Sequence, residues 1–262
     1  MRLDVALVKK GFFVSRAKAA QAVKRGEVLI LGKIEKRCSA EVTDNDVISV
    51  CRQKTFVSLG GYKLDKAFEE FGLNCKDCVF ADLGASTGGF TDVLLSRGAK
   101  KVYCVDVGEG LLDKKISGDD RVVDMSGVNA RYLSKKDFAD ELDGVVVDCS
   151  FISLKLILPT ATNIVKDKGY IVALIKPQFE CGEKNLSKNG IVLGIKRQKA
   201  VVSDIYDFCS EKGWNIAGIT NAPLDVKKNI EYLLLISPTG ERIDKSEVLK
   251  TVETACALKG EL

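Results

Sequence analysis

The stretch Val79-Phe-Ala-Asp-Leu-Gly-Ala-Ser-Thr-Gly-Gly-Phe90 decides the fold of this chain. Its apolar beginning predicts a buried strand, its glycines predict a tight turn, and the residues after Gly88 predict a helix. A second apolar run, Val102-Tyr-Cys-Val-Asp106, also ends in an acidic residue. This layout is typical of a nucleotide-type cofactor site, where glycines allow close approach and Asp106 accepts hydrogen bonds from ribose hydroxyls. A purely structural turn between strand and helix is the alternative.

The spacing of the glycines distinguishes two classes of cofactor. Gly84, Gly88 and Gly89 do not form the G-x-G-x-x-G pattern with which dinucleotide-binding folds cradle a pyrophosphate. S-adenosylmethionine has no pyrophosphate. The Asp-Leu-Gly-x-x-x-Gly pattern that begins at Asp82 therefore favours S-adenosylmethionine over a dinucleotide.

The composition indicates a soluble globular protein. A length of 262 residues suffices for one large α/β domain and a small module. No apolar run approaches the roughly 20 residues of a membrane span, and Met1-Arg-Leu-Asp-Val5 does not resemble a signal peptide. We therefore expect a cytoplasmic protein without stable membrane association. We interpret the nine cysteines as reduced core residues, and expect no metal site because Cys75-x-x-Cys78 has no second pair.

Histidine is absent from the sequence. Its absence excludes Ser-His-Asp hydrolysis, Cys-His proteolysis and the zinc chemistry of the H-E-x-x-H motif. If the protein is an enzyme, its acid–base chemistry must use lysine, aspartate, glutamate, tyrosine or cysteine.

Positive charge is concentrated near the N-terminus. Residues 1–58 contain twelve Lys and Arg and six Asp and Glu, a net charge of +6. The whole chain has a net charge of +4, so the remaining residues carry −2. A small basic module on a nearly neutral domain suggests a nucleic-acid contact. A solvated surface is the alternative, and charge alone leaves both open.

The first fifty residues predict two short helices followed by strands. An apolar face that begins at Leu3 stops at Gly11, and Ser15 is a good N-cap for a second helix that ends at Gly26. Residues 28–32 predict a strand that turns at Gly32-Lys33, and residues 46–50 predict its partner.

This region resembles the α-L RNA-binding module of a small-subunit ribosomal protein, tyrosyl-tRNA synthetases and pseudouridine synthases. The resemblance rests on Arg2-Leu-Asp-Val5, Ser15-Arg-Ala-Lys-Ala-Ala20 and Gly26-Glu-Val-Leu-Ile-Leu-Gly-Lys33. It implies that the basic helix and the turn lie against RNA phosphates, a contact of shape and charge. The implied RNA-binding residues are Arg2, Ser15, Arg16, Lys18, Lys24, Arg25 and Lys33.

The rest of the chain alternates strand and helix, as in a doubly wound α/β fold. We interpret residues 53–61 as a linker and expect a helix from Tyr62 to Phe71. We expect strands at 78–83, 101–106, 121–123, 144–148, 170–176, 214–220 and 230–237, and helices at 88–97, 153–166 and 196–212. Only a short polar loop, 221–229, joins the last two strands, so they must be antiparallel and the final strand is reversed.

Four charged residues are expected at one edge of this sheet. Asp148 and Lys176 end parallel strands, and Glu231 begins the reversed strand. All three therefore lie at the same edge of the sheet as the glycine turn, and open α/β sheets bind ligands at this edge. Lys63, at the entry of the preceding helix, can reach the same crevice. A lysine at the end of a strand, such as Lys176, is by itself best interpreted as an exposed side chain. Glu231 lies within an apolar strand, and burying its carboxylate without a partner would be costly, so a functional role is favoured for the group.

These motifs together resemble the TlyA family over nearly the whole chain, to about Pro238. The matching segments are Gly60-Gly-Tyr-Lys63, Asp82-Leu-Gly-Ala-Ser-Thr-Gly-Gly-Phe-Thr-Asp92, Val102-Tyr-Cys-Val-Asp-Val-Gly108, Asn129-Ala-Arg131, Asp148-Cys-Ser-Phe-Ile-Ser-Leu154, Ile175-Lys-Pro-Gln-Phe-Glu180 and Asn229-Ile-Glu231. TlyA proteins are bacterial and are described both as hemolysins and as ribosomal RNA 2′-O-methyltransferases. They join an α-L module to an FtsJ-like methyltransferase domain.

The resemblance implies a Rossmann-like methyltransferase sheet with a reversed last strand, preceded by a small α+β RNA-binding domain. The implied domains span residues 1–57 and 58–262. Residues 240–262 are a C-terminal extension, where the capping box Asp244-x-x-Glu247 predicts a docking helix. The implied catalytic residues are Lys63, Asp148, Lys176 and Glu231. The implied cofactor-binding residues are Asp82, Gly84, Ala85, Ser86, Thr87, Gly88, Phe90, Asp106, Asn129 and Asp148.

The implied function is S-adenosylmethionine-dependent 2′-O-methylation of ribosomal RNA, with ribosomal subunits as partners. Transfer of a methyl group to a ribose hydroxyl requires an in-line approach and loss of the hydroxyl proton, and Lys176 can orient or deprotonate that hydroxyl. A non-enzymatic RNA-binding assembly factor and a hemolysin are the alternatives. Three features depart from the family pattern: Leu59 replaces an expected arginine, the lysine-rich residues 182–199 lack the usual histidine, and residues 240–262 lie beyond the resemblance.

Overall fold

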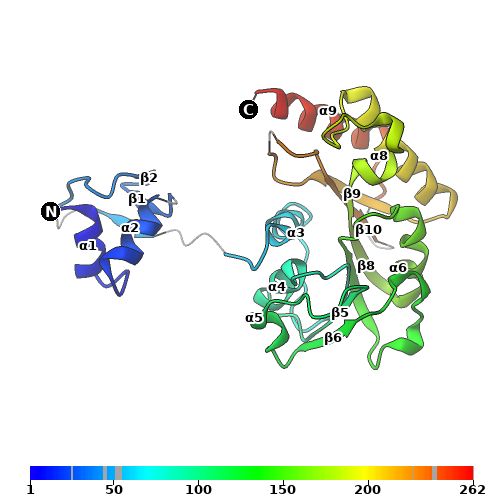
Figure 1. The fold of residues 1–262 in the computed structure, drawn as a ribbon, viewed down its shortest axis with the longest axis horizontal. Helices are drawn as coiled ribbons and strands as arrows, with labels where there is room; N and C mark the ends of the chain where they lie inside the picture. The colour runs from blue at the N-terminus through cyan, green and yellow to red at the C-terminus, as the bar shows by residue number, and fades with distance from the viewer. Residues whose placement is uncertain (25, 44–45, 51–54, 226, 238–240, 262) are drawn as a thin grey trace. The chain divides into compact units, whose positions relative to one another are not determined.

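The computed structural model describes residues 1–24, 26–43, 46–50, 55–225, 227–237 and 241–261 (Figure 1). The chain divides into two compact units, Met1–Thr55 and Phe56–Leu262. The division lies two residues before the predicted boundary at residue 57. Each unit has a hydrophobic core of its own.

The first unit contains two helices and a small antiparallel sheet in the order β2-β1-β3. Its elements are α1 (Leu3–Lys9), α2 (Arg16–Lys24), β1 (Val28–Ile30), β2 (Lys33–Ile34) and β3 (Ile48–Val50). Ser15 caps α2, because its hydroxyl accepts a hydrogen bond from the Lys18 amide at 3.3 Å. The chain reverses at Leu31-Gly32, one residue earlier than the predicted turn at Gly32-Lys33. Leu31 and Gly32 both have positive φ, 50° and 78°, as in the tight turns of hairpins.

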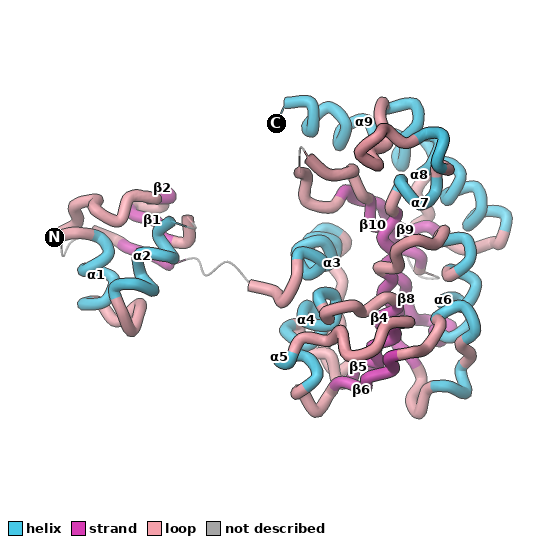
Figure 2. The backbone as a smooth tube through the Cα atoms, viewed as in Figure 1, coloured by secondary structure: helices cyan, strands magenta, loops and turns pink. Residues whose placement is uncertain are grey.

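A seven-stranded sheet forms the centre of the second unit (Figures 1 and 2). Its strands are β4 (Val79–Leu83), β5 (Lys101–Asp106), β6 (Val122–Ser126), β7 (Leu142–Val147), β8 (Val165–Ile175), β9 (Ile216–Asn221) and β10 (Tyr232–Ile236), in the order β6-β5-β4-β7-β8-β10-β9. Strand β10 is antiparallel to both of its neighbours, whereas β4 to β8 pair in parallel. The predicted reversed last strand is confirmed.

Helices cover both faces of the sheet (Figure 2). One face carries α3 (Leu59–Glu70), α4 (Gly89–Ser96) and α5 (Lys114–Ser117). The other face carries α6 (Leu158–Ile164), α8 (Ile195–Glu211) and α9 (Lys245–Glu261). Shorter helical segments are Ala130–Tyr132, Lys135–Asp137, Leu154–Leu156, α7 (Pro177–Glu180) and Glu183–Asn185. Helix α9 packs on the core through Val248 and Val252. Throughout the described ranges, no helix has the length and apolar character that crossing a membrane requires.

The predicted helix over 153–166 is wrong at both ends. Pro159 lies in the first turn of α6, where the lack of an amide hydrogen is tolerated, so the helix starts at Leu158. Strand β8 begins at Val165, five residues before its predicted start, because an irregular register lets Val165 pair with Leu142 before Tyr170 pairs with Gly144. The polar sequence between these pairs shows no strand pattern.

The predicted linker over 53–61 is only partly a linker. Residues 53 and 54 lie outside the described residues, and α3 already begins at Leu59. A Cβ atom on Gly89 would lie 3.1 Å from the Gly61 nitrogen and 3.4 Å from the Gly60 Cα. The absence of a side chain at Gly89 therefore permits a close crossing of α3 and α4, and the pair Gly60-Gly61 belongs to α3 rather than to a flexible connection.

Asp82, which we predicted to lie near the cofactor, is instead buried beneath the turn that follows β4. Its exposed fraction is 0%. Its Oδ2 accepts hydrogen bonds from the Thr91 amide at 3.0 Å and the Thr91 hydroxyl at 2.7 Å. Among the described residues, its Oδ1 has no hydrogen-bond partner. Asp82 thus holds the start of α4 against the end of β4, and burial raises its pKa to about 7.

This buried carboxyl predicts a specific pH dependence of stability. The folded state favours the protonated form of Asp82. The resulting loss of stability is therefore absent below the pKa of Asp82 in the unfolded chain and grows as the pH rises toward about 7. Asp82→Asn removes this penalty. We expect the free energy of unfolding of Asp82→Asn, relative to wild type, to increase from about pH 4 to about pH 7 in urea denaturation. Asp120→Asn, at an exposed site, should show no such trend; a constant difference for Asp82→Asn would contradict the assignment.

Candidate active site

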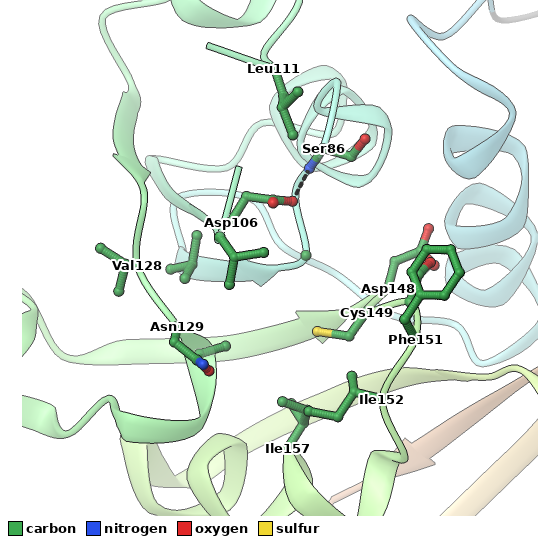
Figure 3. A pocket seen from close by; sticks show the side chains of 15 residues that line it. Ser86, Asp106, Leu111, Val128, Asn129, Asp148, Cys149, Phe151, Ile152 and Ile157 are labelled. Carbon is green, nitrogen blue, oxygen red and sulfur yellow. Dashed lines mark hydrogen bonds between the residues drawn. The ribbon is translucent and has the colours of Figure 1, made fainter. Parts of the chain in front are cut away.

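A pocket opens at the carboxyl ends of β4, β5 and β7 (Figure 3). Its volume is about 470 Å³, within the range of small-molecule sites. Its lining residues are Gly84, Ser86, Val105, Asp106, Val107, Leu111, Val128, Asn129, Ala130, Asp148, Cys149, Ser150, Phe151, Ile152 and Ile157. Figure 3 shows Asp106 and Asn129 on one side and Asp148, Cys149 and Phe151 on the other. The pocket is apolar with a few polar groups, as expected for a nucleoside-type ligand.

Gly84 brings the turn after β4 into the pocket wall. Its φ is +85°, and a Cβ atom there would lie 2.9 Å from the Cys149 nitrogen and 3.0 Å from the Asp148 carbonyl oxygen. The amides of Gly84 and Ala85 both donate to the Val105 carbonyl, at 2.9 and 3.1 Å. Only glycine fits this conformation and this close approach together.

Asp106 joins the turn after β4 to the loop after β5. Its Oδ2 accepts a hydrogen bond from the Ser86 amide at 2.8 Å, and its Oδ1 accepts one from the Gly108 amide at 2.9 Å (Figure 3). Each carboxylate oxygen has further acceptor capacity. A rigidly held carboxylate on the wall of an apolar pocket is suited to ribose hydroxyls.

The ten predicted cofactor-binding residues divide into two groups. Gly84, Ser86, Asp106, Asn129 and Asp148 line the pocket. Asp82, Ala85, Thr87, Gly88 and Phe90 do not. Ala85 and Phe90 are buried in the core beneath α4, and Gly88 starts that helix with a φ of +87°. The four buried residues of this group shape the turn, whereas Thr87 is exposed next to Ser86.

Sequence reasoning missed the apolar lining of the pocket. Ile152 and Ile157 follow β7, Leu111 follows β5, and Val128 follows β6. Their positions just beyond parallel strands are the signal that could have identified them. Chain position alone does not show which side chains turn inward.

The structure brings the four predicted catalytic residues together. Lys176 Nζ lies 2.7 Å from Asp148 Oδ1, and Lys63 Nζ lies 2.5 Å from Glu231 Oε2. Burial raises the pKa of Asp148, and the positive charges of Lys176 and Lys63 partly oppose this effect. The cluster contains two cations and two carboxylates, so it is balanced in charge at the edge of the pocket.

Backbone packing accounts for this convergence. Tyr232 pairs with Ile175 across β10 and β8, which places Glu231 beside the end of β8 that leads to Lys176. A Cβ atom on Gly60 would lie 3.5 Å from Asp148 Oδ2, so the first turn of α3 lies against Asp148. Lys63 follows one turn later.

Ser150 is a further polar residue at this site, and we assigned it no role from the sequence. Lys176 Nζ donates a hydrogen bond to Ser150 Oγ at 2.6 Å. The next residue, Phe151, has a φ of +62°, which is uncommon for a bulky residue, and 90% of its surface is exposed. The signal was available in the quoted segment 148–154, but the direction of the Ser150 side chain depends on this turn.

Two of the predicted RNA-binding residues of the first unit, Arg2 and Arg16, contact an acidic residue. Asp4 is buried and accepts hydrogen bonds from Arg2 Nε at 3.0 Å and Arg16 Nε at 2.8 Å. These contacts, chiefly that with Arg2, lower the pKa of Asp4 to about 2. Ser15 caps α2, as described above. Lys18, Lys24 and Lys33 are exposed, and Arg25 lies outside the described residues.

Each of the two units matches the model of a known protein family. The model of the S4 domain matches residues 1–48, and that of the FtsJ-like methyltransferase family matches residues 56–237. The second match covers more than half of the chain.

Individual relatives match nearly the full length. The chain is 37% identical to YqxC of Bacillus subtilis, described as a candidate rRNA methyltransferase, over 97% of this chain and 93% of the relative. It is 36% identical to the 16S/23S rRNA (cytidine-2′-O)-methyltransferase TlyA of Mycobacterium tuberculosis, over 92% and 91%.

A solved structure from Streptococcus thermophilus, described as a candidate hemolysin, has a TM-score of 0.75 and 35% identity. The similarity covers 100% of this chain and 97% of that one. The predicted family and fold class are confirmed. The chain therefore belongs to the TlyA family, in which an S4 domain precedes an FtsJ-like, S-adenosylmethionine-dependent methyltransferase domain.

Proposed function

We propose that this chain methylates the 2′-hydroxyl of a ribose in ribosomal RNA, a cytidine ribose as the name of the M. tuberculosis relative specifies. The observation that carries the proposal is the pair of lysine–carboxylate contacts beside a nucleotide-type pocket. We further propose that it acts in the cytoplasm on ribosomal subunits.

The pocket fits S-adenosylmethionine. The turn at Gly84 packs closely against the backbone at Asp148 and Cys149 and forms one wall of the pocket, and Asp106 offers acceptors for the ribose hydroxyls. Asn129 and Ser86 would supply further polar contacts, and the apolar lining would hold the adenine. When bound, S-adenosylmethionine supplies a methyl group activated by a positive sulfonium.

The charged cluster would position the ribose hydroxyl and take up its proton. Only 8% of Lys176 is exposed, and Asp148 restrains its ammonium group. Lys63 and Glu231 form the second pair and balance the charge nearby. The sequence has no histidine, and Lys176 lies beside Asp148 and Ser150 at the edge of the pocket, so Lys176 is our candidate for this role. Restraint of the reacting groups contributes to the rate as well.

The S4 unit would bind ribosomal RNA through its phosphates. Asp4 restrains Arg2 and Arg16, so less conformational entropy is lost when they bind phosphate. Lys18, Lys24 and Lys33 would add exposed positive charge.

The two alternatives explain less of the structure. An RNA-binding assembly factor needs the basic S4 unit but neither the cofactor pocket nor the charged cluster. A hemolysin, the description given to the S. thermophilus protein, has no evident use for them either. Methyl transfer requires both.

Substitution of Lys176 tests the activity directly. We expect the wild-type protein to transfer tritiated methyl from S-adenosylmethionine to unmodified ribosomal subunits. Lys176→Ala should lower the rate by about a hundredfold or more, because the ribose hydroxyl loses its proton acceptor. Lys168→Ala, an exposed lysine on the same strand β8, is the matched control and should retain full activity. Absence of transfer to subunits, intact ribosomes and free rRNA, despite cofactor binding, would refute the enzymatic proposal.

Substitution of Gly84 tests the cofactor pocket. Gly84→Ala should abolish detectable binding of S-adenosylmethionine in calorimetry, since the new methyl group would collide with the backbone at Asp148 and Cys149. Gly72→Ala is the control: its φ is +62°, but a Cβ there would have no neighbour within 4 Å in the described part of the chain. Both variants should lose about 1–2 kcal/mol of stability to the left-handed backbone. Equal cofactor affinity in the two variants would exclude the proposed pocket.

Salt dependence tests the RNA contact. Lys24→Ala should weaken binding to ribosomal RNA and reduce the slope of log affinity against log salt by about 1, because one phosphate contact is lost. The measurement is fluorescence anisotropy with labelled rRNA at several salt concentrations. Lys168→Ala should leave the slope unchanged. The same slope for Lys24→Ala and wild type would remove Lys24 from the interface.

A further inference from the structure

The ammonium group of Lys176 is enclosed by acceptors. Its Nζ lies 2.7 Å from Asp148 Oδ1, 3.3 Å from the Asp148 carbonyl oxygen and 2.6 Å from Ser150 Oγ. The contacts with the Asp148 carbonyl and Ser150 Oγ are hydrogen bonds, whereas Asp148 Oδ1 forms an ion pair and accepts no hydrogen bond from the described residues. With 8% of the residue exposed, little of Lys176 is accessible to an incoming hydroxyl.

Ser150 differs from the other two acceptors in two respects. The carboxylate and the carbonyl of Asp148 only accept hydrogen bonds, whereas a serine hydroxyl both accepts and donates. Ser150 is also exposed and lines the cofactor pocket, while Lys176 does not. A ribose hydroxyl that reaches the edge of the pocket beside the bound cofactor therefore meets the exposed Ser150 before it meets the buried Lys176.

The local backbone holds Ser150 in this position. Cys149 and Phe151 flank it in the chain, and Figure 3 shows both at the same wall of the pocket. Phe151 has a left-handed backbone, with a φ of +62°, which costs energy for a residue other than glycine. The amide of Asp148 donates to the Leu83 carbonyl at 2.9 Å, which fixes the start of the segment. A strained turn that is held in place is typical of functional segments.

We propose that Ser150 is a catalytic residue that relays the proton of the ribose 2′-hydroxyl to Lys176. The proposal rests on the proposed methyltransferase function and specifies how its proton leaves. It gives a role to a residue that contacts both the pocket and the buried lysine.

The step balances as follows. Lys176 first releases a proton to water, and its amine lone pair then accepts a hydrogen bond from the Ser150 hydroxyl, which reverses the direction of the observed contact. As the 2′-oxygen forms its bond to the methyl carbon, the carbon–sulfur bond breaks and its electron pair stays on sulfur. The 2′-hydroxyl proton passes to Ser150 Oγ while the Ser150 proton passes to Lys176 Nζ. Ser150 ends as a neutral hydroxyl and Lys176 as an ammonium held by Asp148.

The test compares single-turnover methyl transfer by Ser150→Ala, Ser150→Thr and wild type. We expect Ser150→Ala to be slower by about a hundredfold, with unchanged affinity for S-adenosylmethionine and rRNA. Ser150→Thr retains the hydroxyl and should stay within about tenfold of wild type. Ser126→Ala, which removes a hydroxyl at the end of β6 that contacts Asp124, should leave the rate unchanged.

A double variant separates a relay from an independent structural effect. If Ser150 acts through Lys176, Lys176→Ala with Ser150→Ala should be no slower than Lys176→Ala alone, since residues that act as a unit are not additive. Multiplied losses would overturn the relay. So would a nearly wild-type rate for Ser150→Ala, loss of cofactor affinity in that variant, or failure of Ser150→Thr to restore the rate. If the wild-type protein itself transfers no methyl, the proposed function fails and the relay with it.

Discussion

The close approach of the β4–α4 turn to the end of β7 is the constraint on which the site depends. Gly84 permits it, because a side chain there would collide with the backbone at Asp148 and Cys149. On one side of this contact the turn meets Asp106 and forms the pocket wall. On the other side the chain leads through Asp148 to Ser150 and the charged cluster. The pocket and the charged cluster thus share one backbone contact, as the proposed methyl transfer between them would require.

Electrostatic balance makes the charged cluster possible at this depth. Burial raises the pKa of Asp148, and Lys176 and Lys63 counter that effect. Removing one partner from a buried pair is costly, because the remaining charge keeps its desolvation penalty. Asp82 shows the opposite arrangement. It has no cation among its described hydrogen-bond partners, and burial raises its pKa to about 7. The two aspartates occupy similar strand ends but differ in role, because one meets cations and the other meets Thr91.

Much of the fold was predictable because local pattern and global architecture agree. The apolar runs at β4, β5 and β10 are short, and turn residues bound them. The short loop before β10 leaves no room for a crossover, so the reversed strand follows from chain geometry. The predictions of secondary structure failed where tertiary packing outweighed the local sequence pattern. The polar start of β8 pairs through an irregular register, and Gly60 and Gly61 lie in α3 beneath Gly89 of α4 instead of in a linker.

The sequence by itself determined the alternation of strands and helices, the reversed last strand, the charge of the N-terminal unit and the edge at which the polar residues gather. These properties follow from periodicity, chain length and composition, all of which are local or additive. Only the tertiary structure decided which residues face the pocket, since side-chain direction depends on turns such as that at Phe151. It also decided that Asp82 holds a helix and that Ser150 contacts Lys176. Such contacts join residues far apart in the chain, and no spacing in the sequence specifies a distance of 2.6 Å between two side chains.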